Sequence, residues 1–409
     1  MRTEPGTALP RIPRVGRGRS QAPVIAAVVV VIGVVAGVMA SKGGRRPGPG
    51  FHTPKATLPE LAAEGAAILR KRLPGLTADP AEPWAVAHGV LAFGKTRTLP
   101  GGARALPAII KQHAVREDGR ATFPDFVNGR PIAPHPGMFV KIAFEVDDPL
   151  AELKPEGLDR ASLAKDALAE RQADTLVNQE WLLEILFRTG SAGDEAARTA
   201  GEQVMTRLEQ EQAYIEPYVK DQKHLLDAFD KKTREVDGRQ VAAAIHAWYC
   251  GGNHLFQAAT VAVARGFVKD GPKRLAKQLR ILIFRARAES RYWERKLAQL
   301  DSATVSDSQR ENLLAIFRSQ QLKIVGHVLE SWERILAEPC CPVTATDQAH
   351  TTEVAEDLGR LIKAIDEAGL FESVARSKDP RRKQLRQDLI GDACHALHGL
   401  ELLAARAAR

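Results

Sequence analysis

Residues 306–338, SDSQRENLLAIFRSQQLKIVGHVLESWERILAE, show the pattern that decides the fold class. Mostly apolar side chains recur there at intervals of three and four, and charged side chains occupy the positions between them. A helix with this spacing buries one face and exposes the other. The buried stripe that we predict consists of Leu313, Leu314, Phe317, Gln321, Ile324, Val328, Leu329 and Trp332.

The same spacing runs through the chain from Leu58 onward and predicts an all-α fold. Residues 138–146, MFVKIAFEV, fit either a strand or a short helix, and residues 115–137 are the longest irregular stretch. We expect one domain of helical hairpins over residues 57–409, arranged as a bundle, a solenoid or a closed ring. The predicted helices cover 58–72, 82–94, 103–114, 159–171, 175–189, 194–219, 238–249, 253–268, 272–300, 306–338, 350–369 and 381–407.

The net charge of +8, from 58 Lys and Arg residues against 50 Asp and Glu residues, is unevenly distributed. Residues 1–50 hold eight of the bases and one of the acids, so they carry +7 and the rest of the chain carries +1. A domain that binds nucleic acid needs a positively charged face. The nearly neutral body therefore excludes nucleic acid as a partner.

The charged N-terminal region flanks an apolar segment. Residues 22–40 contain no charged side chain, and as a helix of about 28 Å they are long enough to span a bilayer. More bases precede than follow this segment, which favours a cytoplasmic segment 1–21 and a periplasmic or otherwise extracytoplasmic body at the bacterial inner membrane. Residues 41–56 are rich in Gly and Pro and are expected to form a flexible linker. The alternative is a cleaved signal peptide, because Val38-Met39-Ala40 resembles a cleavage site.

The stretch AIHAWYCGGNHLF, residues 244–256, holds the first candidate site. His246, Cys250 and His254 are spaced four apart, so a continuous helix places them on one face, as a metal site requires. The pair Gly251-Gly252 favours a turn or the close approach of a ligand. The alternative is a plain helix–turn–helix in which Cys250 is a small buried residue.

Two further histidines are candidates for acid–base chemistry. His88 lies in the apolar helix predicted over 82–94, and His327 precedes Glu330 by three residues. A carboxylate within reach of an imidazole holds its tautomer for proton transfer. Both histidines fit a packing role equally well, and the His327–Glu330 pair also fits a helix surface.

The four cysteines allow a disulfide or a second metal-binding pair. Cys340-Cys341 lies between prolines, and adjacent cysteines form a bridge with each other only under strain. In an oxidising compartment one of them is expected to pair with Cys394. Cys394-His395 is also a candidate pair of metal ligands.

The order of five segments resembles a group of uncharacterised bacterial proteins, found especially in planctomycetes. The segments span residues 81–335 and are WAVAHGVLAFGK, PHPGMFV, LVNQEWLLEIL, CGGNHLFQAATVA and GHVLESW, of which CGGxH and GHxLExW are specific. The resemblance implies an α/α toroid, although residues 136–138 and Asn253 depart from the group's pattern. The inward-facing residues that it implies are His88, His135, Cys250, His254, His327 and Glu330.

The short segments VAHG, AWYCGG and CHALHG are also similar to signature motifs of lanthipeptide cyclases, which are α/α toroids that hold zinc. This second resemblance implies zinc ligands at Cys250, Cys394 and His395, with His88 as the acid–base residue. The interval from Cys250 to His395 is longer than in that family.

Two hypotheses of function follow. The first is a membrane-anchored protein with a ligand-binding or catalytic cavity, for which zinc is the candidate cofactor. The catalytic candidates are His88, His327 and Glu330. The ligand-binding candidates are His135, Cys250, Gly251, Gly252 and His254. The rival is a non-catalytic helical scaffold that contacts other proteins of the cell envelope, because no P-loop, GxSxG, HExxH or dinucleotide motif occurs. The scaffold predicts a filled cavity, and the sequence leaves the oligomeric state open.

Overall fold

A computed structural model of the 409-residue chain describes residues 56–127, 130–171, 176, 179–191, 193–213, 215–219, 235–236, 239–240, 249–302, 306–337, 340–376 and 382–408. The segment 1–21, the apolar segment 22–40, the linker before residue 56 and His246 lie outside these ranges. Within them, no helix combines the length and the apolar character needed to cross a membrane.

The described part of the chain is mostly helical, which confirms the all-α prediction. Residues 138–145, for which strand and helix were both open, form a helix. The α-helices are α1 (Glu60–Leu76), α2 (Pro83–Phe93), α3 (Ala105–His113), α4 (Met138–Glu145), α5 (Arg160–Ala169), α6 (Glu180–Thr189), α7 (Glu195–Gln212), α10 (Asn253–Ala264), α11 (Gly271–Ser302), α12 (Asp307–Ala337), α13 (Ala345–Glu367), α14 (Leu370–Arg376) and α15 (Lys383–Ala407), and the 3₁₀ helices are η1 (Ala151–Glu156), η2 (Glu216–Tyr218) and η4 (Tyr249–Gly252).

The stretch 115–137, which the sequence predicts to be irregular, contains two small antiparallel hairpins. β1 (Val115–Glu117) pairs with β2 (Arg120–Thr122), and β3 (Phe126–Val127) pairs with β4 (Arg130–Pro131). A third such pair joins β5 (Glu235–Val236) and β6 (Arg239–Gln240). Phe126 and Pro131 of the second hairpin both contribute to the lining of a cavity.

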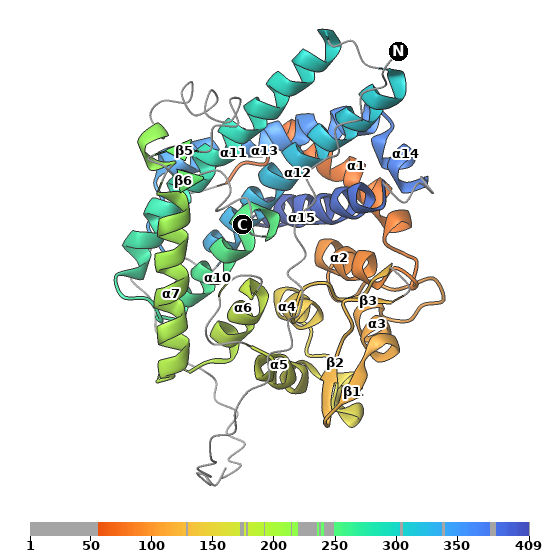
Figure 1. Cartoon of the computed structure of the whole chain (residues 1–409), viewed down its shortest axis with the longest axis vertical. Coiled ribbons are helices and arrows are strands. Elements are labelled where there is room, and N and C mark those ends of the chain that lie inside the picture. Colours follow the sequence, from red (N-terminus) through yellow and green to blue (C-terminus); the bar gives the residue numbers. More distant parts are fainter. Residues whose placement is uncertain are drawn as a thin grey trace, which may run out of the picture. The chain divides into compact units, whose positions relative to one another are not determined.

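Six helices contact one another in a closed cycle: α2 contacts α4, α4 contacts α6, α6 contacts α10, α10 contacts α12, α12 contacts α15, and α15 contacts α2 (Figure 1). The helices that alternate with them along the chain, α1, α3, α5, α7, α11 and α13, pack against this cycle. Sequence neighbours therefore pack as hairpins, and the cycle brings helices from distant parts of the chain into contact.

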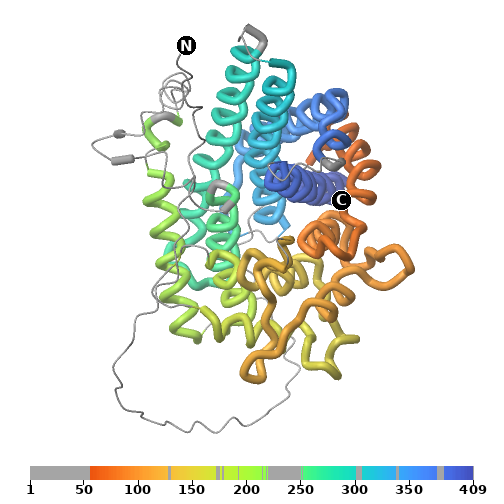
Figure 2. Tube along the Cα trace, turned by 45° about the vertical axis from the view of Figure 1, so that its right-hand side comes forward, coloured from red at the N-terminus to blue at the C-terminus, as the bar shows by residue number. Residues whose placement is uncertain are grey.

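The long helices α11 and α12 lie side by side as a hairpin (Figure 2). The predicted stripe of α12 is correct only in part. Its first members, Leu313, Leu314 and Phe317, are partly exposed, whereas from Gln321 to Leu336 nearly every side chain is buried. The second half of α12 is enclosed because α10, α11, α13 and α15 all contact this helix.

Candidate functional site

Five helices of the closed cycle, α2, α6, α10, α12 and α15, line a cavity of about 410 Å³ together with η4 and residues between 125 and 135. Trp84, Trp181, Phe126 and neighbouring prolines form part of its wall, and polar side chains of α15 form another part. None of the alternating helices α1, α3, α5, α7, α11 and α13 contributes to the lining. The lining residues are Trp84, His88, Asp125, Phe126, Pro131, Pro134, His135, Trp181, Cys250, His254, Lys323, Gln384, Gln387, Asp388, Gly391, Asp392 and His395.

Cys250, His254 and His327 form a cluster that is able to hold a metal ion, because one ligand atom from each lies within 4.8 Å of the others. Cys250 and His254 border the cavity, and His327 is completely buried behind them. This confirms the expectation that Cys250 and His254 share a site. The third member is His327, from a helix about seventy residues further along the chain.

A tight turn positions Cys250 at the start of α10. The turn over η4 places Cys250 and Gly252 in the left-handed backbone region, with φ of 49° and 79°, a conformation that glycine adopts at little cost. Asn253 closes the turn, since its side-chain amide donates a hydrogen bond of 2.8 Å to the carbonyl oxygen of Cys250. The predicted turn is therefore present, and Cys250 and Gly252 are the residues whose backbone makes it.

The hydrogen bonds of the two histidines leave the same nitrogen of each ring available. Nδ1 of His327 lies 2.8 Å from the carbonyl oxygen of Lys323, and Nδ1 of His254 lies 3.1 Å from Oε1 of Gln257. An oxygen of this kind only accepts, so the hydrogen of each ring is on Nδ1. Nε2 of both rings is buried without a hydrogen-bond partner. Metal-binding histidines are typically held in this manner.

Burial shapes the protonation of the cluster. It lowers the pKa of His254 and of His327 well below the ordinary value, with neighbouring charged groups adding to the effect. Burial also raises the pKa of the Cys250 thiol. The histidines are therefore neutral, as ligands must be, while the thiol needs a bound cation to ionise.

Glu330 links two histidines of α15. Nδ1 of His395 donates to Oε2 of Glu330, and Nδ1 of His398 donates to Oε1, both over 2.8 Å. Burial alone would raise the pKa of Glu330, but His395 and His398 lower it well below its usual value. The expected pair of Glu330 with His327 is thus wrong: Glu330 binds α15, and His327 binds the backbone of its own helix.

His395 lies next to the metal-binding cluster. Its ring stacks on that of His327 with centroids 4.0 Å apart, and its Nε2 is buried without a hydrogen-bond partner. His395 also lines the cavity. A histidine so placed, with a carboxylate behind it, is suited to transfer a proton beside the metal.

The structure places His88 and His135 in the same cavity. Nδ1 of His88 donates to the carbonyl oxygen of Trp84 over 2.8 Å, and its ring centroid lies 5.5 Å from that of His395. Burial, followed by the charge of His395, lowers the pKa of His88 to about 3. Burial likewise lowers the pKa of His135 to about 3. Both rings are neutral at physiological pH.

Cys394 has a different environment from His395. It is buried near Arg97, and burial raises its pKa. Cys394 is a free thiol, so the predicted bridge from Cys340 or Cys341 to Cys394 is wrong. It is also absent from the metal-binding cluster, so the ligand set implied by the lanthipeptide-cyclase resemblance differs from the one that the structure brings together.

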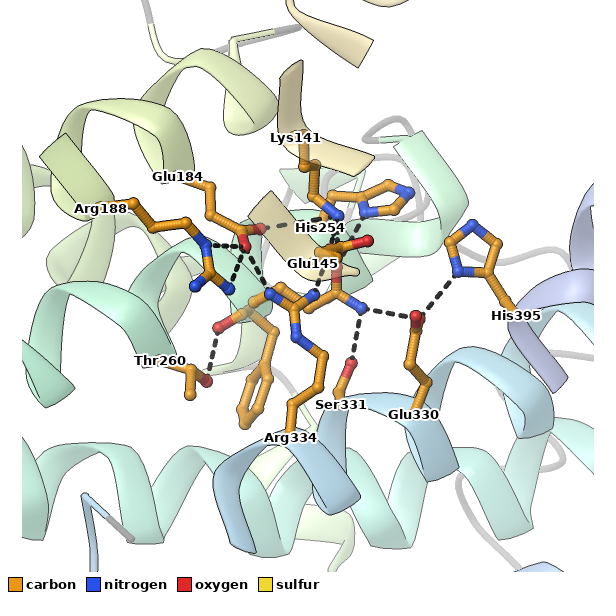
Figure 3. Close-up of polar contacts among 12 residues, drawn as sticks. Lys141, Glu145, Glu184, Arg188, His254, Thr260, Glu330, Ser331, Arg334 and His395 are labelled. Atoms are coloured by element: carbon orange, nitrogen blue, oxygen red, sulfur yellow. Dashed lines mark hydrogen bonds and ion pairs between the residues drawn. The ribbon is translucent and has the colours of Figure 1, made fainter. Parts of the chain in front are cut away.

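A buried network of charges behind the cluster has no counterpart among the predicted site residues (Figure 3). Lys141 pairs with Glu145 and lies 3.6 Å from Glu184. Arg334 pairs with both carboxylates, and Arg188 lies 2.8 Å from Glu184. Burial alone would raise the pKa of Glu184, but the three cations lower it. The signal in the sequence was Lys141, a charge within the apolar stretch MFVKIAFEV.

Comparison of the chain with protein-family models, with curated proteins and with solved structures gives no match.

Proposed function

We propose that the chain is a zinc-dependent hydrolytic enzyme that binds its metal through Cys250, His254 and His327. The observation that carries this proposal is the approach of three ligand atoms to within 4.8 Å of one another at the edge of a cavity. Tetrahedral ligands of zinc lie about 3.3–3.8 Å apart. Side-chain shifts of about one ångström therefore complete the coordination.

The donor set favours zinc. One thiolate and two imidazoles suit this metal better than calcium or magnesium, which prefer oxygen ligands. Catalytic zinc sites have three protein ligands and an open fourth position, whereas structural sites usually have four protein ligands. Cys250 and His254 border the cavity, which supports a site whose fourth position would face a substrate.

Zinc bound in this way would supply a Lewis acid and lower the pKa of a bound water. His395 is the residue of this chain that exchanges protons there, through the Nε2 atom that has no partner among the described residues. Glu330 orients its ring by accepting a hydrogen bond from Nδ1. His88 and His135 border the space that the substrate occupies.

The cavity also supports this proposal over a non-catalytic scaffold. A scaffold predicts a filled interior, while the structure has a cavity that converges on histidine and cysteine side chains. The closed cycle of six helices supports an α/α toroid as the finer description of the fold. Anchoring through residues 22–40 stays a prediction from the sequence.

Cobalt substitution of the full-length chain tests the proposal. Cobalt bound by Cys250 produces a thiolate charge-transfer absorption that is absent from Cys250→Ser and retained in His395→Gln. Azide should change the spectrum, because an open fourth position binds a small anion. A spectrum that azide leaves unchanged would mean a closed structural site and would contradict the catalytic role.

A further inference from the structure

Gln257 is a buried side chain of α10 that contacts two parts of the site. Its Oε1 atom lies 3.1 Å from Nδ1 of His254 and 3.2 Å from Nζ of Lys141. Its Nε2 atom donates to Oε2 of Glu330 over 3.0 Å and to Oγ of Ser331 over 3.2 Å. His254 belongs to α10, Lys141 to α4, and Glu330 and Ser331 to α12 (Figure 3).

The chemistry of the partners determines the orientation of this amide. Lys141 only donates and an ionised Glu330 only accepts, so the oxygen of Gln257 faces Lys141 and its nitrogen faces Glu330. A side-chain amide has two acceptor positions and two hydrogens to donate. All four are used, so the amide has no freedom to turn over.

We infer that Gln257 is the positioning residue that couples the metal ligand His254 to the Glu330–His395 pair. Its oxygen holds the hydrogen of His254 on Nδ1 and so directs the lone pair of Nε2 toward the metal position. Its nitrogen holds the carboxylate that orients His395. The inference rests on the proposed function in that it takes His254 to be a metal ligand.

Two substitutions separate the two ends of this side chain. Gln257→Glu keeps an oxygen for His254 and Lys141 but removes the hydrogens donated to Glu330 and Ser331. Gln257→Met removes both the oxygen that accepts from His254 and Lys141 and the nitrogen that donates to Glu330 and Ser331. Thr260→Val is the matched control, because Thr260 is a buried residue of the same helix whose hydroxyl donates only to the backbone of Phe256 over 3.0 Å.

The experiment measures two properties of the full-length chain. Zinc affinity, from competition with a chromophoric chelator, reports on His254. The ¹⁵N chemical shifts of the imidazoles in zinc-free protein show which nitrogen of His254 and of His395 carries the hydrogen. Thermal unfolding by circular dichroism establishes that each variant is folded.

The expected result is a crossed pattern. Gln257→Met weakens zinc binding by roughly 10- to 100-fold, as the loss of a residue that hydrogen-bonds a metal ligand does. It also changes the imidazole ¹⁵N chemical shifts of both His254 and His395. Gln257→Glu binds zinc about as well as wild type. It changes the ¹⁵N chemical shifts of His395, because the new carboxylate at position 257 and that of Glu330 share a proton. Thr260→Val changes neither property.

Three outcomes would overturn the inference. They are wild-type zinc affinity in Gln257→Met, an equal loss of affinity in Gln257→Glu and Gln257→Met, and unchanged His254 shifts in zinc-free Gln257→Met. A wild-type chain that binds no zinc contradicts the proposed function instead, and the ¹⁵N shifts of the zinc-free protein still decide the role of Gln257.

Discussion

Gly399 of α15 lies directly against the backbone of Glu330 on α12: a Cβ atom at Gly399 would come within 2.7 Å of the Glu330 nitrogen. One turn away, a Cβ atom at Gly326 would lie 3.0 Å from the Cβ atom of Ala396. These small residues allow the two helices to approach closely. The close approach brings Glu330 within hydrogen-bond distance of His395 and places His395 on the ring of His327.

Gly399→Ala should therefore destabilise the protein and disturb the site. The added methyl group meets backbone atoms, which cannot rotate away, and overpacking of this kind costs about 1–3 kcal/mol of unfolding free energy. Chemical denaturation measures the change. The control is Gly75→Ala in α1, where a Cβ atom meets nothing within 4 Å; it should stabilise the protein by up to about 1 kcal/mol. Equal stability of Gly399→Ala and wild type would contradict the close packing.

The buried charge network makes a second prediction. Arg334→Met removes a cationic partner that Glu145 and Glu184 share, and both carboxylate side chains are buried. Breaking a buried ion pair from one side costs about 3–5 kcal/mol of unfolding free energy. Arg70→Met breaks an exposed pair with Glu401 and should change the free energy by about 1 kcal/mol or less. A similar effect of both substitutions in urea denaturation would show that the network adds no more than a surface pair.

The stability should also depend on pH through Glu180 of α6. Burial raises the pKa of this carboxyl group to about 7, so the folded state favours its protonated form. This contribution to stability is complete below the unfolded pKa and is lost as the pH rises through 7. Between pH 4.5 and 8, the unfolding free energy of wild type should fall by up to about 3 kcal/mol relative to that of Glu180→Gln.

Urea denaturation across this pH range measures the difference between the two proteins. Glu117→Gln, at an exposed position of β1, is the control and should follow wild type. Parallel pH curves for wild type and Glu180→Gln would mean that Glu180 titrates normally in the folded protein.

The helices were predictable because their spacing is a local property. The stretch that contains α12 indicates a long helix from its own residues, and the Gly251-Gly252 pair indicates the turn before α10. The full burial of the second half of α12 was not predictable, since it depends on which helices surround it. The His327–Glu330 spacing suggested a pair that does not form, because His327 donates to its own helix and Glu330 accepts from α15.

The site was predictable only in its chemistry. Rare histidines and Cys250 in apolar surroundings indicated the ligands, but Gln257 carried no signal, since its partners Lys141 and Glu330 are more than seventy residues away in the chain. Likewise His395 lies 65 residues from Glu330. Such contacts follow from the packing of hairpins and are not visible as local spacing.

The zinc content of the full-length chain, measured by mass spectrometry after purification and zinc loading, tests the central claim most directly. Wild type should hold about one zinc per chain, Cys250→Ser should hold none, and Cys394→Ser should keep the metal because Cys394 is a buried free thiol outside the cluster. A wild-type chain without zinc, or the same loss in both cysteine variants, would contradict the metal site.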